Sequence, residues 1–200
     1  MQISWSGYGS FRLQENATTV LFDPFDPASD FKIRKTPADL VLLSHRQTKD
    51  DLACVSGDSF MIDSPGEYEV KNIFVNALSY NGQGVIYWLS MGDITFGWLG
   101  PITHNDLSAE ILGIIEGVDI LFIPVGGGSF LSTKEAVGMI NKIEPRLVIP
   151  AYFKISGSKG LGDVEAFLKE YSAPVETIDK LKISKKDLQT EDTRVVVLKP

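Results

Sequence analysis

The stretch that decides the fold reads LVLLSHRQTKDDL and spans residues 40–52. Its first part is a continuous apolar run, which predicts a short buried strand. The run then breaks into a polar loop that opens with His45 and contains Asp50 and Asp51. Imidazole and carboxylate groups are zinc ligands, so a loop of this kind at a strand end is a candidate metal site.

Length and composition favour one globular domain over residues 1–200. The chain is 44% hydrophobic and 22% charged, and it has no apolar run near the roughly 18 residues that span a membrane. Its single cysteine, Cys54, cannot form an internal disulfide, and its first residues lack the pattern of a secretory signal. We therefore expect a cytoplasmic protein.

The charge distribution argues against a nucleic-acid partner, because a net charge of -7 repels a polyanion. The one basic cluster, residues 180–187, is interleaved with acids, which indicates a solvated face and not a phosphate site. No feature predicts a membrane partner. A protein, a small molecule and a second copy of the chain all stay open as partners.

Short β-rich runs separated by turn residues fill the first half of the chain. After residue 108, helical spacing of apolar residues alternates with buried strands, which indicates a layered α/β protein. Ser132 with Glu135 three residues later predicts a capping box at one helix start. Strands are expected at residues 2–7, 18–23, 40–45, 59–63, 73–80, 84–91, 94–100, 119–125, 146–153 and 193–199, and helices at 108–118, 132–144 and 162–171.

Three consecutive glycines, residues 126–128, precede the second of these helices. A glycine-rich turn before a helix can bind an anion. A phosphate loop of the G-x-x-x-x-G-K-[ST] type needs a lysine directly after the last glycine, whereas Ser129 and Phe130 follow here. A tight turn with positive φ angles is therefore favoured over an anion site.

Seven motifs, in order along nearly the whole chain, resemble the metallo-β-lactamase fold, in its branch of small bacterial Zn-dependent hydrolase-like proteins. The resemblance implies a four-layer αββα sandwich, with two mixed β-sheets packed face to face and helices on the outer faces. It also implies hydrolysis with one or two metal ions. The motifs are ISWSGYGSF, VLFDPFDP, ADLVLLSH, DSPGEYEV, WLGP, VDILFIPVGGG and IEPRLVIPAYFK.

The resemblance also locates the family's metal ligands, which lie in H-x-H-x-D-H, H-L-G-D and I-P-x-H motifs, with a further His in G-H-S. His45 matches the first ligand, and most other matched positions carry a different residue. The candidate residues of the former metal-site cleft are His45, Gln47, Asp50, Asp51, Trp98, Pro101, Tyr152, Tyr8 and His104.

Two main interpretations follow. The favoured one is a degenerate, metal-free and non-catalytic binding or scaffold protein, because zinc needs three or four protein ligands and Arg46 and Lys49 would repel a cation. The alternative is a metal-dependent hydrolase of small phosphodiester, lactone or amide substrates. It would hold one zinc or manganese ion at an atypical mononuclear site on His45 with Asp50 or Asp51. A third hypothesis is a subunit that assembles with an active relative.

Aromatic residues stand at several of the changed positions. Tyr8, Trp98 and Tyr152 either line a new ligand pocket or fill the vacated space, and close packing of protein interiors favours the second. We expect Trp98 to contact the loop after His45 or Tyr152. Asp23 matches a position that is expected to be structural.

His104 is the second of the chain's two histidines. It precedes the first predicted helix, beside Asp106 and Ser108. We therefore expect it at the entry to that helix and not in chemistry.

Overall fold

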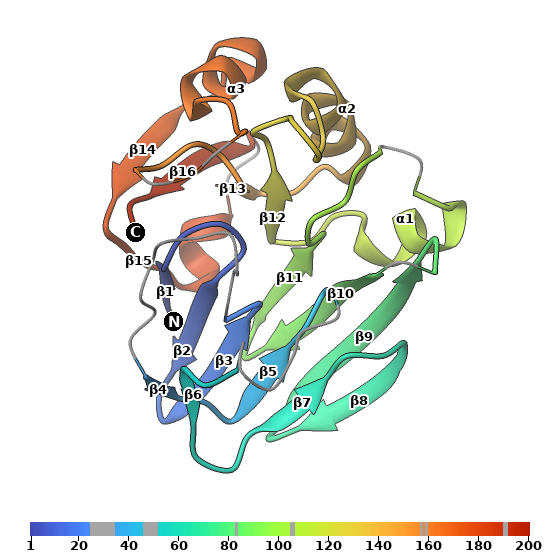
Figure 1. The fold of residues 1–200 in the computed structure, drawn as a ribbon, viewed down its shortest axis with the longest axis vertical. Helices are drawn as coiled ribbons and strands as arrows, with labels where there is room; N and C mark the ends of the chain where they lie inside the picture. Colours follow the sequence, from blue (N-terminus) through green and yellow to red (C-terminus); the bar gives the residue numbers. More distant parts are fainter. Residues whose placement is uncertain are drawn as a thin grey trace.

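The structure is a computed structural model that describes residues 1–24, 35–45, 52–82, 84–104, 107–156, 158, 160–189 and 192–200. Two mixed β-sheets face each other, and α-helices lie beyond the larger sheet (Figure 1). This is the α/β sandwich that the sequence predicts. In the part of the chain that is described, no helix is long and apolar enough to cross a membrane.

The smaller sheet has six strands. Its first pairs are antiparallel, and the β3–β5 and β5–β7 pairs are parallel. In spatial order its strands are β15 (Lys180–Lys182), β1 (Gln2–Trp5), β2 (Phe11–Glu15), β3 (Thr18–Phe22), β5 (Leu40–Leu42) and β7 (Phe60–Ile62). A separate two-stranded sheet pairs β4 (Thr36–Pro37) with β6 (Val55–Ser56).

The larger sheet has eight strands. Antiparallel pairing from β8 to β11 gives way to parallel pairing from β11 to β14, where each chain crossover carries a helix or loop over the sheet. In spatial order the strands are β14 (Val175–Ile178), β16 (Arg194–Leu198), β13 (Leu147–Ala151), β12 (Ile120–Pro124), β11 (Ile94–Trp98), β10 (Gly84–Met91), β9 (Ile73–Tyr80) and β8 (Gly66–Val70).

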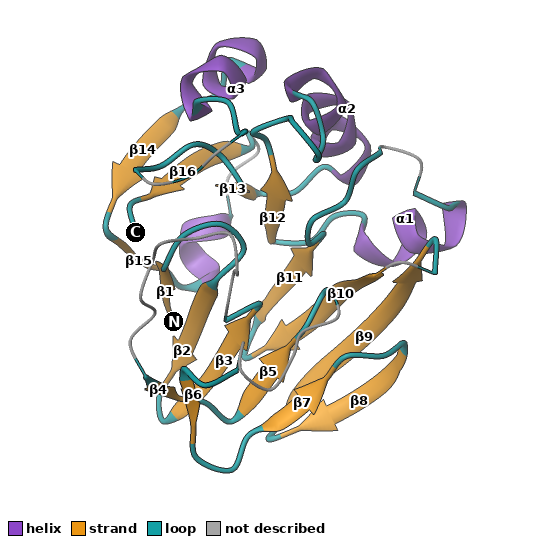
Figure 2. Ribbon diagram, viewed as in Figure 1, coloured by secondary structure: helices purple, strands orange, loops and turns teal. Residues whose placement is uncertain are grey.

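The helices α1 (Ala109–Ile115), α2 (Thr133–Ile143) and α3 (Val164–Tyr171) lie outside the larger sheet (Figure 2). Every residue of β12 and β13 is buried, as expected for parallel strands covered on both faces. The predicted capping box of α2 is present, because Ser132 accepts from the Glu135 N–H and Glu135 accepts from the Ser132 N–H. A short 3₁₀-helix, η1 (Lys185–Leu188), follows β15.

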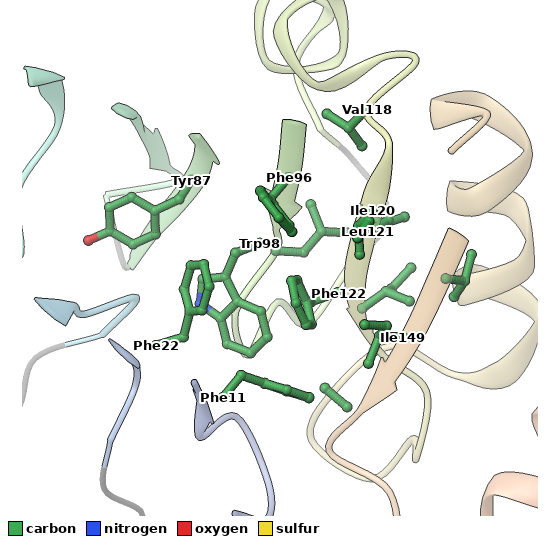
Figure 3. Packing of buried hydrophobic residues seen from close by; sticks show 14 of the residues in the cluster. Phe11, Phe22, Tyr87, Phe96, Trp98, Val118, Ile120, Leu121, Phe122 and Ile149 are labelled. Atoms are coloured by element: carbon green, nitrogen blue, oxygen red, sulfur yellow. The ribbon is translucent and has the colours of Figure 1, made fainter. Parts of the chain in front are cut away.

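Aromatic side chains fill the space between the two sheets (Figure 3). Phe11 and Phe22 come from the smaller sheet, and Trp98 and Phe122 come from the larger one. The ring centroids of Phe11 and Phe122 lie 4.8 Å apart, and those of Phe22 and Trp98 lie 5.4 Å apart. The face-to-face packing of the sheets therefore rests on these rings.

The outer face of the smaller sheet has its own small apolar cluster, in which Leu21 and Val41 pack with Leu52 and Val55. None of the cluster's residues belongs to an α-helix. In the described residues, the segment that carries β6 therefore packs on this face.

The basic cluster at residues 180–187 forms β15 and η1, which the sequence analysis did not predict. Lys180 and Lys182 are exposed, in agreement with a solvated face. Lys185 instead donates to the buried carboxylate of Asp119, with N–O distances of 2.7 and 2.6 Å. This ion pair ties the C-terminal segment to the start of β12.

The glycine turn before α2 has the predicted backbone, because Gly127 has a φ of 64° and Gly128 a φ of 68°. A side chain at Gly126 would lie 2.2 Å from the carbonyl oxygen of Tyr152. The glycines therefore allow the β12–α2 loop to pass close to the end of β13.

Candidate active site

Four strands of the two sheets end at one edge of the sandwich. Asp23 follows β3, His45 follows β5, Trp98 ends β11 and Tyr152 follows β13. Ligands of α/β proteins bind outside the carboxyl ends of parallel strands, which is where these residues lie. Residues far apart in the sequence therefore meet at the candidate site.

A buried carboxylate, that of Asp23, is at the centre of this edge. It is 1% exposed. It accepts hydrogen bonds from the Ser44 N–H at 2.7 Å, from the Ser44 hydroxyl, and from the Trp98 indole N–H at 3.2 Å. The Asp23 N–H donates to the Leu42 carbonyl at 3.0 Å. These bonds join the ends of β3, β5 and β11 through one side chain.

Burial has a large effect on the ionisation of Asp23. Removal from water raises the pKa of this carboxyl above its ordinary value, while His45 and the hydrogen bonds from Ser44 and Trp98 act in the opposite direction. The loss of hydration is the larger effect, because a buried charge is costly unless it is fully paired. The negative charge at this position therefore depends on its hydrogen-bond donors.

The ring of His45 lies beside this carboxylate. Its Nδ1 atom is 3.7 Å from Asp23 Oδ1 and 3.3 Å from the Ser44 hydroxyl oxygen. The His45 side chain is 35% exposed. Because Nδ1 faces Asp23, Nε2 is the ring nitrogen through which His45 would contact a ligand.

Two cavities share a wall that is formed by Ser44, His45, Gly84 and Val85. The inner cavity measures about 100 Å³ and extends toward β11 and the loop after it. The outer cavity measures about 450 Å³ and extends toward Asp63. The Val85 N–H donates to the Ser44 carbonyl at 2.8 Å, which fixes the start of β10 against this wall.

The three aromatic residues at changed motif positions, Tyr8, Trp98 and Tyr152, are packed and do not line either cavity. Trp98 is fully buried and stacks on Tyr152, with ring centroids 6.2 Å apart, so the predicted Trp98–Tyr152 contact is confirmed. Tyr8 meets Tyr152 edge-on at 6.4 Å. Whether these side chains replaced metal ligands stays a prediction.

Three of the nine described non-glycine residues with positive φ angles lie at the same edge. Tyr8, Asp23 and Tyr152 have φ angles of 49°, 36° and 50°, in the left-handed region that non-glycine residues rarely adopt. The Tyr152 hydroxyl lies where a side chain at Gly9 would be, 2.2 Å from its Cβ. Strained residues of this kind cluster at functional sites, where the surrounding contacts hold them in place.

The other predicted residues are divided between this site and other places. Pro101 lines the inner cavity with His45. His104 is exposed, and its carbonyl accepts from the Tyr80 hydroxyl at 3.2 Å. His104 is not among the residues that line either cavity.

Gln47, Asp50 and Asp51 lie outside the described residues. The sequence analysis missed Ser44 altogether and assigned Asp23 a structural role only. The signals available for Asp23 were its place at the end of the apolar run TTVLF and its match to the family motif VLFDPFDP.

Comparison with known proteins identifies the family. A sequence profile for the beta-lactamase superfamily domain matches residues 2–152. The chain belongs to the beta-lactamase superfamily.

Curated superfamily relatives span nearly the same length. A UPF0173 protein of Pyrococcus abyssi is 24% identical over 197 residues, covering 85% of this chain and 90% of the relative. A protein of Carboxydothermus hydrogenoformans named UPF0173 metal-dependent hydrolase is 25% identical, covering 76% of this chain and 84% of the relative.

Two solved structures share this fold. A Thermotoga maritima crystal structure, named as a Zn-dependent hydrolase of the metallo-beta-lactamase superfamily, superimposes with a TM-score of 0.85 at 27% identity, covering 98% of this chain and 97% of its own. Igni18, a metallo hydrolase of Ignicoccus hospitalis, shares the fold with a TM-score of 0.66 at 14% identity, covering 100% of this chain and 95% of its own.

These comparisons overturn two expectations from the sequence. A non-catalytic, metal-free protein was favoured, and no cofactor was expected. Several curated relatives are instead named metal-dependent hydrolases, and a similar structure is named a Zn-dependent hydrolase. The expectation of a metal-free protein rested on counting every changed motif position as a lost metal ligand. The names of the relatives show that this count was a poor guide to function.

A metal centre of three or more side chains is not complete within the described ranges, which omit residues 46–51. No group of at least three His, Cys, Asp or Glu side chains there is close enough to hold an ion. His45 fits one ligand position, because its Nδ1 atom faces a carboxylate and its ring lines a cavity. The described residues therefore fit a single ligand and not the whole centre.

Proposed function

We propose that this protein is a metal-dependent hydrolase of small molecules, with an atypical mononuclear reaction centre on His45. Membership of the superfamily and the names of its relatives support hydrolysis and a metal requirement. The observation that carries the proposal is the His45–Asp23 pair, which lies at the strand ends where His45 lines two cavities.

The chain's own residues prepare His45 for contact with a ligand. Asp23 lies 3.7 Å from Nδ1 and is itself held by Ser44 and Trp98, so the ring orientation is supported by a buried network. A carboxylate behind a histidine fixes its ring and leaves the other nitrogen for a cation or substrate. Ser44 Oγ, 3.3 Å from Nδ1, limits rotation of the ring from a second side.

A bound divalent ion would supply a water molecule of lowered pKa as the attacking group. His45 would be one of the residues that hold it. The sequence offers Asp50 and Asp51, five and six residues after His45, as the nearest carboxylates outside the described ranges. Because the described residues supply one ligand only, no catalytic step is assigned to the ion.

Hydrolysis assays with a matched histidine control test this proposal. The protein is stripped with a chelator and then supplied with zinc or manganese, and turnover of a phosphodiester, a lactone and an amide is measured. We expect metal-restored turnover that falls about 100-fold in His45→Ala. His104→Ala removes the chain's other histidine, away from the cavities, and should keep the wild-type rate.

Two results would count against the proposal. One is an absence of metal-restored turnover of all three substrates. The other is an equal loss of turnover in His45→Ala and His104→Ala, because the reaction would then not depend specifically on the histidine that lines the cavities.

A further inference from the structure

The inner cavity beside His45 has the form of a pocket for a small apolar group. Ser44 and His45, at one end, belong to the candidate active site, and the hydroxyl-bearing residues Tyr80 and Thr103 also line the cavity. Aliphatic side chains form most of the opposite wall, and these residues are nearly fully buried. They are Val85, Ile86, Leu99 and Ile102.

The chemistry of this wall selects against charged groups. The described residues that line the cavity include neither lysine nor arginine, so a phosphate or carboxylate against the aliphatic wall would lose its hydration without gaining a cationic side chain there. An apolar group gains from the same environment, because it leaves water for a hydrocarbon surface. The pocket therefore favours a neutral aliphatic group.

The volume limits the size of that group. An apolar cavity of roughly 150 Å³ takes benzene, which has six carbon atoms. Scaled to the 100 Å³ measured here, the space accepts about four carbon atoms. A short branched chain fits, and a long alkyl chain does not.

We propose that the inner cavity binds the short, neutral aliphatic acyl group of an amide or ester substrate. This rests on the proposed hydrolase function and narrows its substrate class. The carbonyl carbon would lie at the His45 end, and the alcohol or amine part would extend into the outer cavity, where Ser64, Ser79 and Asp63 supply polar contacts. Water gives its hydroxyl to the acyl carbon and its remaining hydrogen to the leaving oxygen or nitrogen.

A chain-length series tests the pocket through activity. With 4-nitrophenyl esters and zinc-supplied protein, we expect the isobutyrate to exceed the acetate about 15-fold in kcat/KM, from about fourfold for each of two buried carbons. The octanoate should fall below the isobutyrate, because its chain exceeds the cavity. Equal rates across the series would overturn the proposal.

Variants of one wall residue change the pocket in opposite directions. Ile102→Phe should fill the cavity and reduce the isobutyrate preference to about onefold, while Ile102→Ala should move the optimum to a longer chain. Ile183→Ala is the control, since Ile183 is also a buried isoleucine of the core but does not line the cavity. Loss of stability alone would not produce two opposite shifts in chain-length preference. The same chain-length preference in all three variants would contradict the proposal.

Binding is measured separately from turnover. In protein with ¹³C-labelled isoleucine methyl groups, titration with isobutyramide should shift the Ile86 and Ile102 resonances saturably, with a Kd about 15-fold lower than for acetamide. Ile102→Phe should remove this saturable shift. If the wild type hydrolyses nothing but binds isobutyramide in this way, the pocket stands and the hydrolase proposal fails. If it hydrolyses substrates without this binding, the pocket assignment fails.

Discussion

Replacement of Trp98 by alanine should destabilise the protein by about 4–6 kcal/mol. Trp98 is fully buried and stacks against Tyr152, while its ring also packs on Phe22 and Phe11. Deletion of a large buried aromatic side chain costs about 3–5 kcal/mol. Loss of the indole hydrogen bond to Asp23 adds about 1 kcal/mol, because Ser44 still donates to that carboxylate.

Urea denaturation measures this loss. With a slope of about 3 kcal/mol/M, the upper end for small proteins, the midpoint should fall by about 1.5 M. Trp98→Phe keeps an aromatic ring but removes the N–H donor, so it should cost less, about 1–3 kcal/mol.

Trp88 is a matched control for this prediction. It is a half-buried tryptophan on the neighbouring strand β10. Trp88→Ala should cost about 1–2 kcal/mol, because part of its side chain stays in water in the folded protein. If Trp98→Ala lowers stability no more than Trp88→Ala, then the aromatic packing at the strand ends does not hold the two sheets together.

Two further predictions concern single sites. Gly100→Ala should cost about 2–4 kcal/mol, because Gly100 has a φ of 63° and its new Cβ would lie 2.6 Å from Ser44 Cβ. Gly113→Ala in helix α1 is the control, because it has open space and should stabilise the protein by about 0.5–1 kcal/mol. Thermal melts that show equal changes in the two variants would refute the steric argument. The hydrogen bond from Lys71 lowers the pKa of the half-buried Asp39 carboxyl, so this pair stabilises the fold above the unfolded-state pKa near 4, and the contribution is lost as the pH falls through the lower folded-state pKa. The unfolding free energies of the wild type and Lys71→Met, measured by urea denaturation, should differ by less than about 1 kcal/mol at pH 5 and converge by pH 2. A difference that stays constant over this range would contradict the prediction.

Local sequence patterns predict much of the fold. The apolar runs that became β10, β12 and β13 are long and buried, and Ser132 with Glu135 marks the start of α2. The exposed strands β14 and β15 carry little apolar periodicity, so no local pattern distinguishes them from loops. They form because they pair with β16 and β1, which is a long-range effect.

The candidate site was predictable only in part. His45 follows a recognisable strand, so its place at a strand end could be inferred. Its pairing with Asp23 depends on strands 20 residues apart lying side by side, in the β3–β5 pairing that joins Val20 to Leu40. The burial of Asp23 also depends on Trp98, from the other sheet, and no local signal reports such a contact.

Metal stoichiometry most directly tests the claim that this protein is a metal-dependent hydrolase centred on His45. The purified chain is dialysed against zinc or manganese and then against metal-free buffer, and its metal content is measured by plasma emission. We predict about one ion per chain for the wild type and for His104→Ala, and less than about a tenth of that for His45→Ala. Wild-type protein that retains neither metal, or a His45→Ala variant that retains as much as the wild type, would contradict the claim.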